Sequence, residues 1–146
     1  MAYLEKHFQS KFTKWWKIQK NLGYFAGSYA IELKLVKAPK KSLSILSFQA
    51  QQLPSLQKAT TPIGISKKLS DLDPSLKPCD FISMSDANGL VAVQFYKIRQ
   101  RKPKFIMIEI DDLITAFKKK QDNNQRQTLT EKECKLIGIE YGFDSK

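Results

Sequence analysis

The chain has 146 residues, a formal net charge of +11 and a hydrophobic fraction of 42%. These values predict one folded domain with its own core and exclude an intrinsically disordered chain. The sequence holds no apolar run of the ~20 residues that a transmembrane helix needs, and it begins without a signal-peptide core, so we expect neither membrane insertion nor secretion.

The apolar spacing of the first half predicts alternating helices and strands. Leu4, Phe8, Phe12 and Trp15 recur at near-helical spacing, and Gly23 is suited to cap the end of that helix. We expect a helix over 3–20, paired strands over 23–27 and 29–36, a short strand over 42–47, a helix over 48–60 with Pro54 in its first turn or at a kink, and a strand over 63–66.

We expect the second half to begin with a polar loop over 66–79. Asp86-Ala87-Asn88-Gly89 is typical of a hairpin turn, and Thr128 or Thr130 is suited to cap a last helix. We expect strands over 81–84, 90–96 and 105–110, a helix over 111–121, a mobile polar stretch near 118–128 and a short C-terminal helix. The predicted fold class is α/β, a single domain over 1–146 with a mixed central sheet flanked by helices.

The two cysteines indicate the compartment. Cys79 and Cys134 lie far apart and form no Cys-x-x-Cys motif. Such a pattern is typical of a reducing, cytoplasmic environment and gives neither cysteine a functional role.

The charges are divided unevenly along the chain. The first 70 residues hold twelve lysines but only two acids, Glu5 and Glu32. This imbalance predicts a polyanionic partner, for which nucleic acid is the first expectation. The basic residues expected to contact DNA phosphates are Lys11, Lys14, Lys37, Lys40, Lys41, Lys67, Lys68, Arg99 and Arg101. The alternative is a charged surface that only keeps the protein soluble.

Glu32 and Lys34 form the most distinctive pair in the sequence. Alternation along the strand predicted over 29–36 places both on one face and Ile31, Leu33 and Leu35 on the other. Burying such charges is costly unless they pair or bind a metal. The pair is therefore either an ion pair on a solvated strand or part of a chemical site.

The order of these residues resembles a known family. Glu5 on a first helix, Ile31-Glu32-Leu33-Lys34 on a strand and Gln52 on the next helix resemble the PD-(D/E)XK nuclease superfamily, and within it the Holliday junction resolvases of the archaeal type and their bacterial relatives. The stretches 67–71 and 77–81 are similar to small phage-type members of that group. The resemblance covers roughly residues 4–112.

The resemblance implies a restriction-endonuclease-like core and a Mg²⁺-dependent endonuclease, with Mn²⁺ as a substitute. Its implied substrate is branched DNA, above all the four-way Holliday junction. It also implies a homodimer, because a junction needs two symmetric cuts. The implied catalytic residues are Glu32, Lys34, Gln52 and Glu5.

The chemistry of phosphodiester hydrolysis explains why these residue types would be needed. A hard divalent cation neutralises developing charge and activates water, and Mg²⁺ takes oxygen ligands. Glu32 and the carbonyl of Leu33 would bind the metal directly, and Glu5 through a water or at a second ion. Lys34 would position or deprotonate the water or stabilise the transition state. Gln52 would orient the water or contact the phosphate.

One acid of the family pattern is missing. The family carries an acid before the Glu-x-Lys strand, but residues 6–31 contain neither Asp nor Glu. Asp80 is the first candidate to supply this metal ligand and Asp71 the second. Without a replacement, the chain would be a DNA-binding module that does not cut.

Several residues also have ordinary structural interpretations. Glu5 suits the start of any helix because of the helix dipole. Gln52 suits a solvated helix surface, Asp80 a turn cap and Asp71 a loop. His7 has no second histidine to share a metal with, so it is interpreted as a surface or phosphate-contacting residue.

Overall fold

The computed structural model describes residues 2–68 and 81–143. Its helices are α1 (Ala2–Asn21), α2 (Gln52–Ala59), α3 (Ile110–Asp122) and α4 (Glu131–Ile137), with one 3-10 turn, η1 (Ile45–Ser47). Its strands are β1 (Tyr29–Val36), β2 (Ser42–Ser44), β3 (Ile65–Lys68), β4 (Phe81–Met84), β5 (Asn88–Phe95), β6 (Lys104–Glu109), β7 (Thr128–Thr130) and β8 (Ile139–Gly142).

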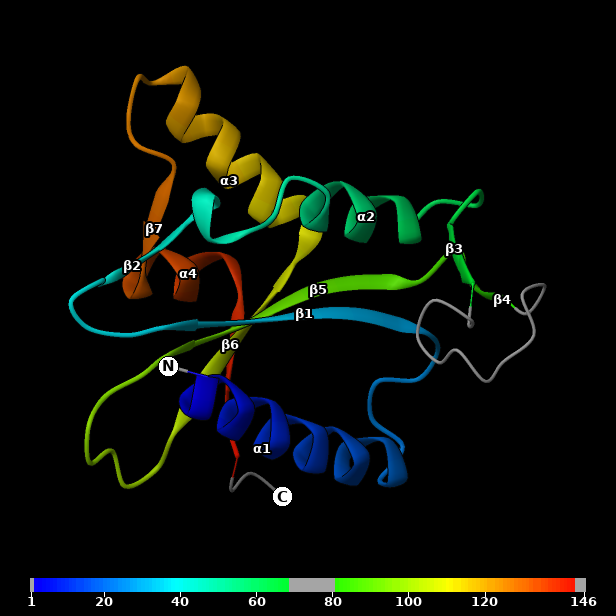
Figure 1. The fold of residues 1–146 in the computed structure, drawn as a ribbon, viewed down its shortest axis with the longest axis horizontal. Coiled ribbons are helices and arrows are strands. Elements are labelled where there is room, and N and C mark those ends of the chain that lie inside the picture. Colours follow the sequence, from blue (N-terminus) through cyan, green and yellow to red (C-terminus); the bar gives the residue numbers. More distant parts are fainter. Residues whose placement is uncertain (1, 69–80, 144–146) are drawn as a thin grey trace.

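The main sheet has the strand order β1-β5-β6-β8. β1 pairs with β5 in parallel, while β5–β6 and β6–β8 are antiparallel. Two smaller sheets join β2 to β7 and β3 to β4. In Figure 1, α1 lies below the sheet and α2, α3 and α4 lie above it. The predicted α/β class with a mixed sheet is therefore confirmed. Within residues 2–68 and 81–143, no helix combines the length and apolarity needed to span a membrane.

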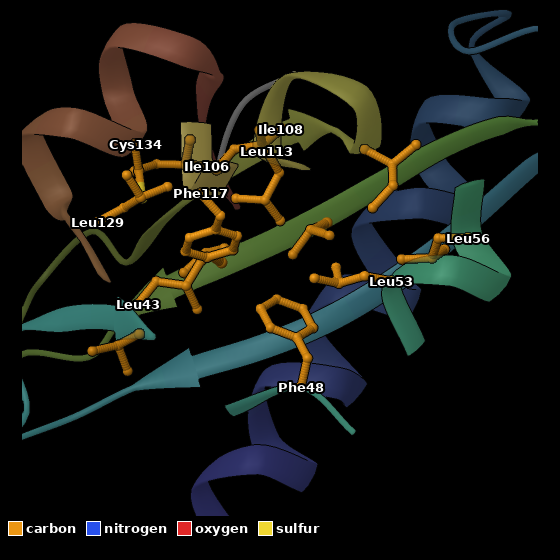
Figure 2. Close-up of a cluster of buried hydrophobic side chains, with 14 of the residues drawn as sticks. Leu43, Phe48, Leu53, Leu56, Ile106, Ile108, Leu113, Phe117, Leu129 and Cys134 are labelled. Carbon is orange, nitrogen blue, oxygen red and sulfur yellow. The ribbon is translucent and has the colours of Figure 1, made fainter. Parts of the chain in front are cut away.

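The two faces of the sheet carry different cores. On the α1 side, the rings of Phe8, Phe12 and Trp15 pack against Phe105 of β6. On the other side, aliphatic residues from the sheet, α2 and α3 pack around the rings of Phe48 and Phe117, whose centroids are 6.4 Å apart (Figure 2). Cys134 is buried in this second core, where burial raises the pKa of its thiol to about 12, so it is a packing residue.

β1 alternates as its sequence predicts. Ala30 and Val36 belong to the core on the α2 side, whereas Ile31, Leu33 and Leu35 pack with the core on the α1 side. Because side chains alternate along a strand, Glu32 and Lys34 point to the α2 side.

The predicted strand over 23–27 is wrong. Gly23, Phe25 and Gly27 all have positive φ angles, of 89°, 55° and 97°, which a strand cannot contain. The Nζ of Lys20 holds the segment in this shape by donating to the carbonyls of Phe25, at 2.7 Å, and Gly27, at 3.0 Å. β1 therefore has no hairpin partner before it and forms an edge of the described sheet.

The predicted hairpin at 86–89 is also wrong. β4 pairs with β3 while β5 pairs with β1 and β6, so the connection does not join two neighbouring strands. Its N–H groups bond elsewhere: Asp86 to the carbonyl of Thr61, Ala87 to that of Ala59 and Asn88 to that of Ser28. The first two acceptors lie at the last residue of α2 and just after it, so only tertiary packing supplies them.

Other boundaries shift by a few residues. The strand predicted over 42–47 divides into β2 and η1, and the helix predicted over 48–60 begins at Gln52, with Pro54 in its first turn. Residues 118–122 of the stretch predicted as mobile belong to α3. Thr130, one of the two caps predicted from the sequence, caps α4 through a capping box with Glu133.

A core substitution should test this packing. Leu113 of α3 is wholly buried in the second core, so Leu113→Ala should lower the free energy of unfolding by about 2–5 kcal/mol in chemical denaturation. Leu136→Ala, at an exposed leucine of α4, is the matched control and should change it by less than about 0.5 kcal/mol. Equal effects of the two substitutions would contradict this core.

Candidate active site

Three of the residues predicted from sequence form one hydrogen-bonded cluster. The Nε2 of Gln52 donates to Oε1 of Glu32 at 3.1 Å, and the Nζ of Lys34 donates to Oε1 of Gln52 at 3.0 Å. Lys34 and Glu32 also form an ion pair, with 3.7 Å between Nζ and Oε1. The neutral amide therefore bridges the carboxylate and the ammonium, using its donor for one and its acceptor for the other.

The backbone before α2 completes the environment of Lys34. Its Nζ donates to the carbonyl of Ser47 at 2.8 Å and lies 4.8 Å from the ring centroid of Phe48. The N–H of Gln49 donates to the same amide oxygen of Gln52 at 2.9 Å. η1 and the segment after it therefore fix the lysine and the glutamine together.

The cluster is only partly open to solvent. The side chain of Lys34 is 17% exposed and that of Glu32 is 30% exposed. An ammonium at this depth is favourable only because carbonyl, amide and carboxylate oxygens surround it. The geometry therefore differs from a solvated surface ion pair, in which each partner would have few other contacts.

Glu5 lies on the same hollow as Glu32. A hollow of about 470 Å³ runs along β1, lined by Glu32, Leu33 and Lys34 from the strand, Ser47 from η1 and Glu5 from the first turn of α1. β1 is at the edge of the described main sheet, so side chains from both faces of that sheet reach this hollow. Two carboxylates from distant parts of the sequence thus line one opening.

Two basic connections leave the sheet near this hollow. Because β1 and β5 are parallel, the segments 37–41 and 96–103 that follow them leave at the same end, on the left in Figure 1. Lys40, Lys41, Arg99 and Arg101 are exposed there, and Lys37 is half-buried. This end of the molecule therefore carries a concentrated positive charge.

The remaining predicted residues lie elsewhere or outside the description. Asp71 and Asp80 lie outside the described residues. β3, which contains Lys67 and Lys68, lies at the opposite end of the sheet from the two basic connections (Figure 1). On α1, Lys14 is exposed, and the Nζ of Lys11 lies 5.9 Å from the ring centroid of Phe143.

Sequence reasoning missed the groups that hold Lys34. The carbonyl of Ser47 and the N–H of Gln49 are backbone atoms, which carry no residue-specific signal. Phe48 was visible only as an apolar residue of a predicted helix. Their roles depend on the turn of η1, a segment that was predicted from the sequence as the end of a strand.

The described part of the chain offers few metal ligands. Within residues 2–68 and 81–143, no three His, Cys, Asp or Glu side chains come together as a metal site. The carboxylates of Glu5 and Glu32 are the pair that the hollow provides. Because Mg²⁺ keeps several waters and is held by as few as one or two carboxylates, this donor set fits a hard cation.

Comparison of the chain with protein-family models, curated proteins and solved structures found no match. The assignment of a function therefore depends on the chemistry of the hollow itself.

The hydrogen bonds of Gln52 should contribute to stability. Gln52→Leu removes one acceptor of Lys34 and one donor to Glu32, so it should lower the free energy of unfolding by about 1–3 kcal/mol. Gln51→Leu, at the exposed neighbouring residue, is the control and should have little effect. Chemical denaturation of both variants measures the difference. A stable Gln52→Leu variant would show that the cluster is not held as described.

Proposed function

We propose that this protein is a metal-dependent, structure-selective DNA endonuclease with a core of the restriction-endonuclease type. The observation that carries the proposal is the cluster of Glu32, Lys34 and Gln52 on a hollow that Glu5 also lines. The same four residues were selected from the sequence by their resemblance to PD-(D/E)XK nucleases. Glu32, Lys34 and Gln52 contact one another, and Glu5 lines the same hollow as Glu32 and Lys34, which supports the proposal.

In this mechanism, Glu32 and Glu5 would hold a Mg²⁺ or Mn²⁺ ion, with the carbonyl of Leu33 as a further donor on the same hollow. When bound, the ion would neutralise the charge that develops on the phosphate and acidify a water. Gln52 orients the carboxylate of Glu32 through its amide N–H. Lys34 keeps an ammonium 3.7 Å from Glu32, where it would stabilise the negative charge of the transition state.

Branched DNA is the proposed substrate class. The exposed cations of segments 37–41 and 96–103 would grip phosphates without reading bases, which suits recognition of DNA shape. A Holliday junction is the first candidate, and two copies of the chain in a homodimer would supply the two cuts that it needs.

A DNA-binding module without cleavage is the second candidate. Two observations favour it. The described residues bring only two carboxylates to the hollow, and β1 lies at the edge of the sheet, whereas the family carries its Glu-x-Lys on a central strand. The contacts of Lys34 and Gln52 with Glu32 favour the enzyme, because they place an ammonium and an amide beside a potential metal ligand.

Glu32→Gln should separate these two functions. The isosteric amide removes a metal ligand but keeps the shape of the side chain, so cleavage of a labelled four-way junction with Mg²⁺ should be lost while binding persists. Lys34→Ala should remove most of the turnover. Glu109→Gln, at an exposed carboxylate of β6 away from the hollow, is the control and should cut normally. Cleavage within about tenfold of wild type in Glu32→Gln, roughly 1.4 kcal/mol of barrier, would refute the assignment.

The basic connections should dominate DNA affinity. Replacing Lys40 and Lys41 with alanine should weaken binding to all DNA sequences alike and should reduce the slope of log affinity against log salt by about 2. Lys118 and Lys119 of α3, also exposed, form the control pair. Fluorescence anisotropy over a salt series gives both quantities. A preference for one base sequence at constant DNA shape would contradict this model of recognition.

A further inference from the structure

A second hollow lies on the other side of the first turns of α1. It has a volume of about 300 Å³, and its walls include Tyr3, His7 and Lys11 of α1, Gln94 of β5, and Tyr96 and Arg99 of the connection that follows. Glu5, between Tyr3 and His7 in sequence, lines the first hollow. The two hollows are therefore neighbours that share one helical turn.

The sheet also connects the two hollows. Leu35 of β1 lines the first hollow and Gln94 of β5 lines the second, and these two residues are partners in the parallel pairing of the strands. Neighbouring strands lie about 4.8 Å apart. The two hollows therefore flank the N-terminal end of α1 over adjacent strands.

Gln94 is the unusual residue in the second hollow. Its side chain is only 7% exposed, yet it forms no side-chain hydrogen bond with the described part of the chain. Among those residues, the only wholly buried side-chain polar atom without a partner is Nε1 of Trp15, so the amide of Gln94 still opens into the hollow it lines. A buried amide that lacks a protein partner calls for another group to bond it.

The entrance carries an aromatic stack. The rings of Tyr3 and His7 are nearly parallel, with an interplanar angle of 10° and centroids 5.9 Å apart, and Tyr3 is 74% exposed. Exposed aromatic rings are stacking platforms for the bases of single-stranded nucleic acid. This pair presents such a platform beside the buried amide.

The walls also carry positive charge. Lys11, Lys97 and Arg99 line the hollow, and no acid is among its described lining residues. Lys97 is already paired with Glu131, at 3.1 Å, which leaves Lys11 and Arg99 to attract an anion. The hollow therefore combines the three features that a nucleotide needs: a stacking surface, an amide for a base edge and cations for a phosphate.

We propose that this hollow binds one unpaired nucleotide of the DNA substrate. The base stacks on Tyr3 and His7 and bonds its polar edge to Gln94, while Lys11 and Arg99 contact the phosphate. This proposal rests on the nuclease function proposed for the first hollow, and it narrows the class of DNA substrate. The DNA must carry a single-stranded segment, such as a flap or the open centre of a junction, next to the phosphate to be cut. A base inside an intact duplex is stacked on its neighbours, so it cannot lie against the rings of Tyr3 and His7.

The test is binding by the wild-type chain and its variants in EDTA, which measures recognition without cleavage. Fluorescence anisotropy would compare a short single-stranded oligonucleotide, a flap and a blunt duplex. Tyr3→Ala and Gln94→Leu should weaken binding to the single strand and the flap by about five- to hundredfold. Both should leave binding to the duplex within about twofold. Tyr24→Ala, at an exposed tyrosine just after α1, is the control and should bind all three as wild type does.

A thermal melt distinguishes recognition from a folding effect. Because Gln94 has no partner within the described protein, Gln94→Leu should keep or raise the melting temperature even as it loses single-strand affinity. A lower melting temperature, or unchanged affinity in both variants, would overturn the proposal.

Further results distinguish base recognition from phosphate recognition, and the nucleotide site from the nuclease function. An abasic oligonucleotide of equal length that binds as tightly as the normal one would show that only phosphate is recognised, which would also overturn the proposal. Loss of single-strand binding in the variants, together with no cleavage by wild type with Mg²⁺ or Mn²⁺, would support the nucleotide site while refuting the nuclease. Cleavage of flaps by wild type with unaltered binding in the variants would give the reverse conclusion.

Discussion

The part-buried ammonium of Lys34 is the constraint around which this end of the molecule is arranged. A lysine at this depth is tolerable only when its N–H groups meet oxygen acceptors. Two acceptors are present, the carbonyl of Ser47 and the amide oxygen of Gln52, and the carboxylate of Glu32 is an ion-pair partner at 3.7 Å. The hydrogen bonds of the Lys34 ammonium therefore hold η1 and the first turn of α2 against β1. They also hold Glu32 in a defined orientation beside the hollow.

The position of β1 at the edge of the sheet gives this cluster its access. Among the described residues, β1 has a neighbouring strand on one side only, which is β5. At the edge, residues from α1 below the sheet and from η1 above it line one opening, so Glu5 and Glu32 share a hollow although 27 positions separate them. The bend at 23–27, held by Lys20, leaves that edge open.

Most of the candidate site was visible in the sequence because its members are rare in their surroundings. Glu32 interrupts an apolar strand, and Glu5 and Glu32 are the two acids of a strongly basic half. Gln52 was selected by its position in a family pattern. The second hollow was not visible. Gln94 looked like one polar residue in a buried strand, and Tyr3 and His7 became a stacking pair only through the geometry of the helix.

The sequence by itself determined the α/β class, the helices α1 and α3, the alternation of β1 and the cap of α4, because periodicity and capping are local properties of the chain. Tertiary structure alone decided which strands are neighbours. The segments 23–27 and 86–89 have turn-forming residues, but their direction depends on distant partners: the side chain of Lys20 for the first, and carbonyls of Ala59 and Thr61 for the second. Strand order, and with it the open edge of β1, follows from contacts that no local pattern encodes.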